Sequence, residues 1–416
     1  MARLLGATTP RAISASVRTR PRFQHHHART VGTAASQGLG LEPDVLSEYP
    51  GLDASKLTIA KNKNPKQLLR KEDLIFGRDF TDHMLTAEWT AATGWAAPAI
   101  IPFQKICLEP QTTVFHYGIE CFEGQKAYRA RDGSLRLFRA DMNAARLNKS
   151  TARLALPQVD PEQLQKLIRS LVALEDRFIP SERGYSLYLR TNVIGTQPSL
   201  GIGPSLSALL FCIACPVGPY YPTGFKAVKL EATGESVRAW PGGVGDKKLG
   251  ANYGPCILPQ LMAQKRGFQQ NLWLFGAEEQ VTEVGAMNFF AVLRDAKGRR
   301  ELVTPPLDGT ILEGITRNSV LALARERLVP EGWEVSERVC TMAELASAAA
   351  DGRLEEAFGV GTAAVVSPIR SIDWKGITVN CGLDADQEAG DTAIRLKNWI
   401  EEIQYGEVDH PWSTPV

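Results

Sequence analysis

The chain has 416 residues, of which 44% are apolar and 22% charged, and its formal net charge is +1. This length and apolar fraction suffice for two or three structural units with sizeable cores, and they exclude an intrinsically disordered or disulfide-dense chain. The balanced charge excludes an extended nucleic-acid surface, and no apolar run approaches the roughly 18 residues that span a bilayer. We therefore expect a soluble globular protein with no nucleic-acid and no membrane partner.

The first 41 residues contain six Arg and no Asp, Glu or Lys. An Arg-rich segment with Ser and Ala and without acids is typical of a mitochondrial presequence, whereas a secretory signal needs an apolar stretch that is missing here. We predict that residues 1–36 are a disordered presequence and that the protein is in the mitochondrial matrix. A basic tail without a targeting role is the alternative.

The seven cysteines are an odd number and widely spaced, which favours reduced thiols over a disulfide framework. Cys212 and Cys215 form a C-x-x-C inside the apolar run 209–215. We interpret them as small apolar residues of a buried strand rather than as a redox or zinc pair. No second C-x-x-C or nearby His cluster completes a metal site, so no metal is expected.

The predicted elements of the first half lie in residues 42–215, which we expect to form a smaller N-terminal α/β domain. Ala127–Ala130 and Leu135–Phe138 flank an Asp-Gly turn and predict a hairpin. Pro161–Ile179 carries apolar residues on one face and predicts a helix. Residues 216–225 are rich in Pro and Gly and are predicted to be an interdomain linker.

Residues 226–416 are predicted to form a larger C-terminal domain in which strands and helices alternate. The predicted strands are Ala227–Glu231, Leu272–Phe275, Asn288–Leu293 and Glu301–Thr304, and the predicted helices are Asn252–Arg266, Ile315–Leu328 and Met342–Ala350. Thr341 and Glu344 have the spacing of a capping box at the start of the last helix. The alternation in both halves indicates an α/β or α+β fold class.

A Gly-rich run from Pro241 to Gly254 holds Lys247 and Lys248 just before a predicted helix. Its spacing differs from a Walker A loop, which requires G-x-x-x-x-G-K-[ST]. Lys248 lies five residues before Tyr253, whose hydroxyl can address the same ligand, and a lysine in such a place can form a Schiff base. From the spacing alone, two solvated lysines in a loop remain the simpler interpretation.

Three later segments are suited to a charged ligand: one offers a carboxylate to a cationic group, and two offer backbone N–H groups to an anion. Glu283 is the single carboxylate of an otherwise uncharged stretch. The Thr304–Arg317 segment places Gly and Thr at the opening of a helix, where free N–H groups suit a phosphate. The small-residue turn Gly359–Ala363 can bring amides close to an anion. Taken singly, each is weak, because Gly-rich turns are common.

The alternation in Tyr185–Arg190 places two polar side chains on one face of a strand. Leu187 and Leu189 point one way, and Tyr188 and Arg190 point the other way. A Tyr and an Arg that point the same way can hold carboxylates, and a polar solvent-exposed face is the alternative interpretation.

In their order, these segments resemble the branched-chain amino-acid aminotransferases, of the fold-type IV pyridoxal-phosphate family. The resemblance runs from about Phe76 to Tyr405 and rests on Phe76-Gly77, Phe80–Leu85, Phe122-Glu123-Gly124, Tyr188-Leu189-Arg190, Lys248–Tyr253, Glu283-Val284-Gly285, Thr304–Arg317 and Gly361-Thr362-Ala363. It implies the two-domain fold of that family, similar to D-amino-acid aminotransferase, with the cofactor bound by the larger C-terminal domain. It also implies a homodimer whose site takes residues from the partner subunit.

The resemblance implies reversible transamination of leucine, isoleucine and valine with 2-oxoglutarate, giving branched-chain 2-oxo acids and glutamate. The implied mechanism is ping-pong, between pyridoxal 5'-phosphate and pyridoxamine phosphate, with Lys248 as the catalytic lysine. The implied cofactor-binding residues are Arg146, Lys248, Tyr253, Glu283, Leu312, Ile315, Thr316 and Thr362. The implied substrate-binding residues are Phe76, Tyr117, Phe122, Tyr188, Arg190, Tyr220 and Ala363.

Within that set, the resemblance assigns a separate part of the cofactor to each group. The phosphate is implied to meet Arg146, Ile315, Thr316 and Thr362. Tyr253 is implied to meet the phenolate oxygen, and Glu283 the pyridine nitrogen. Without the resemblance, Arg146 would be interpreted as a residue at the edge of a helix and the aromatic residues as core.

Two departures from the family pattern and three competing functions remain at this point. Ala286 stands where many relatives have Thr, and Ala364 and Ser367 stand where vertebrate mitochondrial relatives have a C-x-x-C pair. A D-amino-acid transaminase and an aminodeoxychorismate lyase share the fold, and a catalytically silent binding relative would keep only the scaffold. The joint retention of Lys248, Arg146, Tyr253 and Glu283 argues against the silent relative. The sequence does not indicate the physiological direction of the reaction.

Overall fold

The computed structural model describes residues 51–219 and 225–416. The predicted presequence and Tyr220 of the predicted linker lie outside the described residues. Within the described parts of the chain, no helix is long and apolar enough to cross a membrane.

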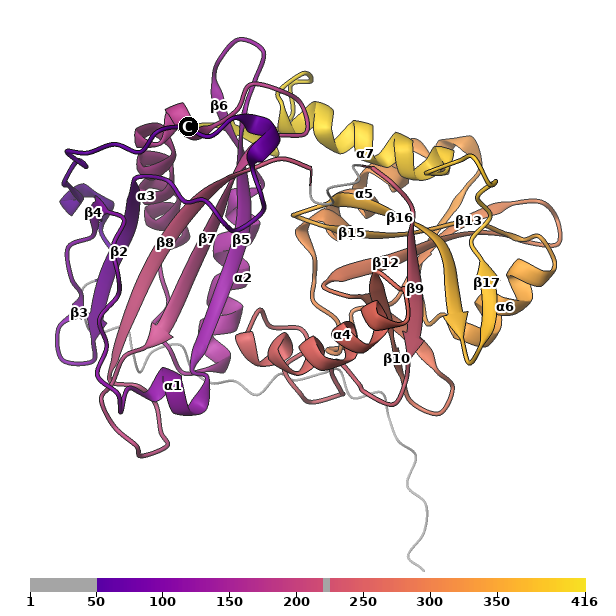
Figure 1. Cartoon of the computed structure of the whole chain (residues 1–416), viewed down its shortest axis with the longest axis horizontal. Coiled ribbons are helices and arrows are strands. Elements are labelled where there is room, and N and C mark those ends of the chain that lie inside the picture. The colour runs from indigo at the N-terminus through magenta and orange to yellow at the C-terminus, as the bar shows by residue number, and fades with distance from the viewer. Residues whose placement is uncertain (1–50, 220–224) are drawn as a thin grey trace, which may run out of the picture. The chain divides into compact units, whose positions relative to one another are not determined.

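The strands of the described residues form two mixed sheets (Figure 1). The first has the order β1-β4-β2-β8-β7-β5-β6-β18, with β3 paired to β2. Its strands are β1 (Thr58–Ile59), β2 (His83–Thr90), β3 (Gly94–Trp95), β4 (Ala99–Pro102), β5 (Glu120–Arg129), β6 (Leu135–Phe138), β7 (Ser186–Gly195), β8 (Ser207–Val217) and β18 (Ser413–Pro415). The predicted hairpin is β5–β6, in which Ala127 pairs with Leu137.

The second sheet contains β9 to β17, and six of its strands close into a ring. Its strands are β9 (Val228–Thr233), β10 (Gln270–Phe275), β11 (Gln280–Val284), β12 (Met287–Arg294), β13 (Arg300–Thr304), β14 (Glu334–Glu337), β15 (Leu354–Gly361), β16 (Val365–Trp374) and β17 (Ile377–Asn380). The ring is β11-β10-β9-β16-β15-β12, and it closes because β11 pairs with both β10 and β12. A closed barrel leaves these six strands without free edges. The mixed α/β class predicted from the sequence is confirmed.

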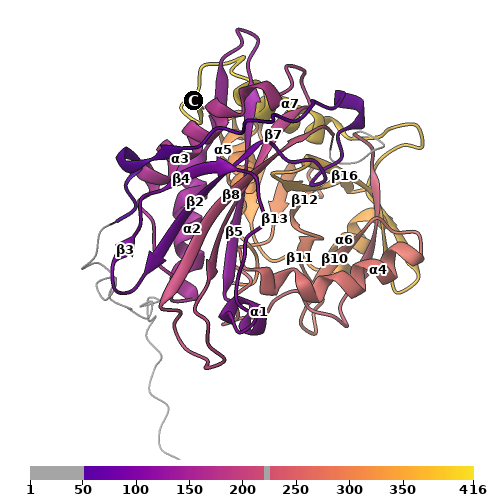
Figure 2. The same cartoon turned by 60° about the vertical axis from the view of Figure 1, so that its left-hand side comes forward.

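The helices of the described residues cover the two sheets. They are α1 (Thr113–Tyr117), α2 (Ala140–Arg153), α3 (Pro161–Leu174), α4 (Ile257–Lys265), α5 (Ile315–Arg327), α6 (Met342–Ala350) and α7 (Asp391–Gln404). The 3-10 turns are η2 (Ala54–Lys56), η3 (Lys71–Asp73), η4 (Asp176–Phe178), η5 (Gly250–Asn252), η6 (Gly254–Cys256) and η7 (Val329–Glu331). Figure 2 shows α2 and α3 against one face of the first sheet.

Burial explains why these segments form these elements. The apolar face of α3, including Leu164, Leu167 and Leu171, packs with Leu187 and Leu189 of β7 in one core. Strand β12 is buried on both faces, so it has a continuous apolar sequence rather than an alternating one. The helices α5 and α7 pack together on the outside of the barrel.

Two predicted helices have different bounds in the structure. The helix predicted over Pro161–Ile179 ends at Leu174, and the chain continues as η4 after Glu175, whose carboxylate contacts the buried His83 at 2.5 Å. The helix predicted from Asn252 begins only at Ile257. Gly254 and Pro255 interrupt it, because a proline has no N–H to donate to the preceding turn. Half of the predicted capping box of α6 is formed, since Thr341 Oγ1 accepts from the Glu344 N–H at 3.2 Å, whereas the Glu344 carboxylate accepts from Arg338.

The chain passes from the first sheet to the second between Val217 and Val228, where the linker was predicted. The C-terminal strand β18 returns and pairs antiparallel with β6, so residues 226–416 contribute to both sheets. The domain boundaries at residues 216–225 therefore stay a prediction.

Candidate active site

Lys248 lies in the loop before α4, and the first sheet with its helix α2 fixes its backbone. The Lys248 N–H donates to Ser150 Oγ on α2 at 2.9 Å, and its carbonyl accepts from the Phe122 N–H on β5 at 3.0 Å. The Lys248 Nζ then donates to the Tyr253 hydroxyl at 2.9 Å. The five-residue spacing brings this amine and this phenol together, as predicted.

Lys247 has a different environment although it is adjacent. Its ammonium contacts the carboxylate of Asp246, and its carbonyl accepts from Asn252 Nδ2 at 2.7 Å. Lys247 does not line the cavity that Lys248 lines. The two lysines therefore have different surroundings: Lys248 lines the cavity, and Lys247 contacts a local carboxylate.

A cavity of about 500 Å³ adjoins Lys248. The predicted site residues that line it are Phe76, Phe122, Tyr188, Arg190, Lys248, Tyr253, Thr362 and Ala363. Glu120, Gln270 and Ala286 also line it. The structure thus brings Lys248 with Tyr253, the predicted carboxylate-binding pair and the small-residue turn to one cavity.

Strand β7 supplies the polar pair of the cavity wall. Leu187 and Leu189 are in the core of the first sheet, whereas Tyr188 and Arg190 line the cavity, so the predicted alternation is confirmed. Arg190 Nη2 donates to the Tyr188 hydroxyl at 3.1 Å. The guanidinium lies 4.6 Å from the ring centre of Phe122, within the range of a cation–π contact.

Gly124 on β5 makes room for Tyr188. A Cβ atom at Gly124 would lie 2.0 Å from the Tyr188 hydroxyl oxygen. The ring of Phe76 packs edge-on against Tyr188, with 5.0 Å between the ring centres. Tyr188 is therefore held between a glycine and an aromatic ring.

Arg146 lies on α2, buried against a carboxylate. Its Nε and Nη2 donate to the two oxygens of Glu123 at 2.7 and 2.8 Å, and its Nη1 donates to the Glu313 carbonyl at 3.0 Å. Burial disfavours the charge, but Glu123 outweighs this and raises the pKa of Arg146. The bond to Glu313 places this fixed cation beside the start of α5.

Helix α5 begins at Ile315, and both Ile315 and the next residue, Thr316, are buried. Its cap residue, Gly314, has extended backbone and offers no side chain to the first N–H groups. Free N–H groups at a helix start, together with the helix dipole, attract a phosphate. Arg146 and this helix start are thus suited to the same anion.

Glu283 at the end of β11 is a buried carboxylate, only 2% exposed. Its Oε2 contacts Arg238 Nε at 2.6 Å, and its Oε1 accepts from the Leu312 N–H at 2.9 Å. Burial raises the pKa of Glu283, while Arg238, the Leu312 N–H and Lys248 act in the opposite direction. This carboxylate therefore lies in the protein interior rather than on the exposed face of its strand.

Two predicted substrate residues are not among those that line the cavity. Tyr117 on α1 is 40% exposed, and its hydroxyl contacts the Leu200 carbonyl. Tyr220 lies outside the described residues. Their roles stay predictions.

Three residues that hold the site together were not among the predicted site residues. Ser150 accepts from the Lys248 N–H, Glu123 pairs with Arg146, and Arg238 pairs with Glu283. Glu123 had a signal, because it stands in the Phe122-Glu123-Gly124 segment. Ser150 and Arg238 had none, since each is far from its partner in the sequence.

Comparison with known proteins identifies the family. A model of amino-transferase class IV matches residues 120–372. The cytosolic branched-chain-amino-acid aminotransferase of Saccharomyces cerevisiae is 54% identical over 367 residues, covering 88% of this chain and 98% of that protein. The mitochondrial one of the same yeast is also 54% identical, covering 88% and 93%.

A solved structure has the same fold. It is a branched-chain amino acid aminotransferase from T.th., complexed with N-(5'-phosphopyridoxyl)-L-glutamate, which is 25% identical, with a TM-score of 0.60 over 79% of this chain and 97% of that one. From the sequence matches and the shared fold, this chain belongs to the class IV aminotransferases and, within them, to the branched-chain-amino-acid aminotransferase family.

Proposed function

We propose that this protein transfers the amino group reversibly between leucine, isoleucine or valine and 2-oxoglutarate, with pyridoxal 5'-phosphate as cofactor. Two yeast relatives at 54% identity bear the name of this activity, and a relative of the same fold holds a phosphopyridoxyl-glutamate. The observation that carries the proposal is one cavity that contains Lys248 with Tyr253 and, on its wall, Tyr188 with Arg190.

The described residues fit the cofactor by the chemistry of their groups. A primary amine at Lys248 suits its aldehyde, and a phenol at Tyr253 suits its ring oxygen. The buried carboxylate of Glu283 suits its ring nitrogen, and Arg146 with the start of α5 suits its phosphate. When bound, pyridoxal phosphate supplies an electron sink for the pair of electrons that the substrate Cα–H bond releases.

Lys248 is proposed as the base that removes the proton from the substrate Cα. The Tyr253 hydroxyl holds its Nζ at 2.9 Å, and the Phe122 ring centre lies 4.9 Å from the same atom. Since the backbone of Lys248 is fixed at both its N–H and its carbonyl, the amine has a defined reach into the cavity.

Glu283 is proposed to keep the ring nitrogen protonated, because an adjacent carboxylate favours the charged form. Arg238 is 3% exposed at its side chain and favours the ionised form of Glu283. Arg238 therefore favours an ionised Glu283 at a buried position where burial alone would favour the protonated carboxyl.

Substrate recognition is proposed to use the wall of β5 and β7. Tyr188 and Arg190 offer donors to carboxylates, including the side-chain carboxylate of glutamate. Phe76 and Phe122 present apolar rings to a branched alkyl chain. A guanidinium that rests on an aromatic ring lets one pocket accept both kinds of side chain.

A substrate panel with 2-oxoglutarate as acceptor tests the proposed function. We expect leucine, isoleucine and valine to give the highest kcat/KM, with glutamate as the common product. The panel includes D-amino acids and aminodeoxychorismate as competing substrates. A higher kcat/KM for either, or no absorbance change on adding pyridoxal phosphate, would contradict the proposal.

We also propose that the protein is a homodimer. Exposed apolar side chains on α1, on the 200–206 loop and on α4 support an interface, and they include Phe115, Ile202, Ile257 and Leu258. Tyr117, which does not line the cavity of its own chain, lies among them. Sedimentation should give twice the chain mass, and Leu258→Glu should shift it toward the monomer. Ile377→Glu, at another exposed position, is the matched control.

The mitochondrial matrix is proposed as the location, from the Arg-rich first 36 residues. The yeast relatives include one mitochondrial and one cytosolic protein, so similarity alone favours neither. Deletion of residues 1–36 should leave an active enzyme in the cytosol. Import of the shortened chain into mitochondria would contradict the proposal that residues 1–36 are a presequence.

A further inference from the structure

Arg139 at the start of α2 is a half-buried cation that the proposed function does not use. It occupies the N-cap of the helix, where Ser, Thr, Asp and Asn are favoured and a positive charge opposes the helix dipole. Its φ is 49°, in the left-handed region that residues other than glycine rarely adopt. Two local preferences are thus broken at one residue, and such positions are held by tertiary contacts and are frequent at functional sites.

The contacts that hold Arg139 come from the C-terminal segment and from α5. Its backbone N–H donates to the Trp412 carbonyl at 2.8 Å, and its guanidinium carbon lies 4.2 Å from the centre of the Trp412 ring. Its Nη1 donates to Ser319 Oγ at 2.9 Å, and this buried hydroxyl donates in turn to the Ile315 carbonyl at 2.8 Å. Arg139 is thereby bonded to the first turn of α5, whose N–H groups are suited to the cofactor phosphate.

Arg139 differs from the neighbouring cations in its charge balance. In the described parts of the chain, no carboxylate lies within ion-pair distance of its guanidinium, which contacts Ser319 and Trp412 instead. Burial lowers the pKa of Arg139, and Asp141 offsets this only in part. The other cations beside the start of α5 are each paired, namely Arg146 with Glu123, Lys149 with Glu313, and Arg317 with Glu337. Among these cations, the unbalanced positive charge is therefore that of Arg139.

We propose that Arg139, held over Trp412, is a positioning residue for the cofactor phosphate, which fixes the start of α5 through Ser319 and supplies the positive charge that favours a dianion there. A phosphate ester carries close to two negative charges at neutral pH, so it gains more from an unpaired cation than a neutral ligand does. Because Trp412 directly precedes β18, the C-terminal strand acquires a role in cofactor binding. The inference rests on the proposed function, since it takes Arg146 and α5 as the phosphate site.

The test compares the binding of pyridoxal 5'-phosphate with that of pyridoxal, which has the same ring and aldehyde but no phosphate. The full-length protein is freed of cofactor with hydroxylamine, and both dissociation constants are measured by absorbance. Arg139→Met should raise the dissociation constant of pyridoxal 5'-phosphate by about tenfold, because one charge near a dianion is lost. The dissociation constant of pyridoxal should change by less than about twofold, since Lys248, Tyr253 and Glu283 are distant from the substitution in the site and untouched.

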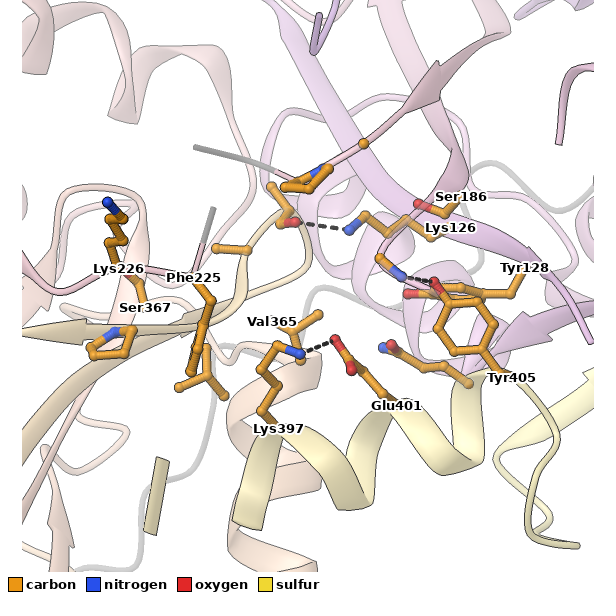
Figure 3. A pocket seen from close by; sticks show the side chains of 18 residues that line it. Lys126, Tyr128, Ser186, Phe225, Lys226, Val365, Ser367, Lys397, Glu401 and Tyr405 are labelled. Atoms are coloured by element: carbon orange, nitrogen blue, oxygen red, sulfur yellow. Dashed lines mark hydrogen bonds and ion pairs between the residues drawn. The ribbon is translucent and has the colours of Figure 1, made fainter. Parts of the chain in front are cut away.

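Two further variants separate the charge of Arg139 from the packing of its side chain. Arg139→Lys keeps a cation over the Trp412 ring and should restore the affinity for pyridoxal 5'-phosphate to within about threefold of wild type. Lys397→Met is the matched control, because Lys397 on α7 is also a half-buried cation over an aromatic ring (Figure 3). Its Nζ lies 5.2 Å from the centre of the Phe225 ring and contacts Glu401 at 2.7 Å, so this variant should bind both ligands like wild type.

Trp412→Leu tests the same role from the C-terminal side, because it removes the ring and leaves the charge. The guanidinium then loses its aromatic contact, so the dissociation constant of pyridoxal 5'-phosphate should rise by about threefold and that of pyridoxal by less. Trp412→Phe keeps a ring at this position and should bind both ligands like wild type.

Equal losses of affinity for pyridoxal 5'-phosphate and pyridoxal in Arg139→Met would overturn the proposal, because they indicate a general loss of structure. Failure of Arg139→Lys to restore the affinity would also overturn it. If Arg139→Met does not fold, Trp412→Leu decides, and an unchanged ratio of the two dissociation constants in that variant refutes the proposal. A wild-type protein that prefers pyridoxal 5'-phosphate to pyridoxal but does not transaminate leucine would contradict the proposed function instead.

Discussion

The two sheets contribute to the candidate site in different ways. The first sheet provides side chains from within its strands, as with Phe122 on β5 and Tyr188 and Arg190 on β7. The barrel provides the ends of elements, namely Glu283 at the end of β11 and the turn Thr362–Ala364.

This difference follows from how each region orients its groups. In a strand, the alternation of side chains fixes which residues share a face, so the wall of the cavity is set by local geometry. At a turn or a helix start, the useful groups are backbone amides, and their direction depends on contacts from elsewhere in the chain. We expect substitutions in the two regions to affect different kinetic constants.

Lys248→Ala should have the largest effect, because it removes the base while leaving the cavity walls. A positioned base contributes up to about 10⁴-fold, so we expect kcat to fall by at least about a thousandfold. Lys247→Ala is the matched control and should stay within about twofold of wild type, since Lys247 contacts Asp246. Borohydride reduction with bound pyridoxal phosphate, followed by peptide mapping, should label Lys248. A label on Lys247 would contradict the assignment.

Loss of the charge at Glu283 should have the second-largest effect on kcat. Glu283→Gln should lower kcat by about a hundredfold and cofactor affinity by less, because shape is kept and charge is lost. Equal kcat in the variant and the wild type would mean that Glu283 does not face the ring nitrogen.

The pair of Glu283 and Arg238 predicts a pH dependence of kcat. Removing Arg238 leaves the burial of Glu283 uncompensated and raises its pKa further. A carboxyl with a raised pKa ionises only at higher pH, so the acid limb of the kcat profile should move to higher pH in Arg238→Met. Arg238→Lys retains the charge and should move it less. An unchanged acid limb in Arg238→Met would argue against coupling of the two groups.

Gly124→Ala should have a smaller effect, and on substrate binding rather than on kcat. The added methyl would meet the Tyr188 hydroxyl at 2.0 Å, so Tyr188 must move away from Arg190. We expect the KM for leucine and for 2-oxoglutarate to rise by about tenfold, the cost of one hydrogen bond to a charged group. Gly51→Ala, at a position with open space around it, is the control. A change in kcat alone would place Tyr188 outside substrate recognition.

Mild peroxide should have the smallest effect. Cys212 and Cys215 are buried in β8, in two different core clusters, so their side chains point to opposite faces of the strand. Burial raises the pKa of Cys212 to about 12, which suppresses the reactive thiolate. Activity should therefore persist in peroxide, with little recovery on adding dithiothreitol. A reversible loss that disappears in Cys212→Ser would show that this pair does react.

The sequence by itself determined most elements and the residues that carry the chemistry. The 3.6-residue and two-residue periodicities are local, so α6 begins and ends where it was predicted, and Tyr188 and Arg190 share a face. The resemblance pointed to Lys248 and Glu283 because their flanking segments are short and distinctive. The predicted bounds of α3 and α4 were wrong, because Glu175 makes a tertiary contact at the end of α3 and an internal Gly-Pro delays the start of α4.

Only the tertiary structure decided which distant groups support those residues. Ser150 meets Lys248 across 98 positions of the chain, and Lys126 meets Ala363 across 237. Arg238 became the partner of Glu283 because folding buries both side chains and leaves neither charge in water. Periodicity and spacing carry information about neighbours in the sequence, whereas these pairs are set by the packing of two sheets. A buried charge requires a partner, but the sequence does not state where in the chain that partner lies.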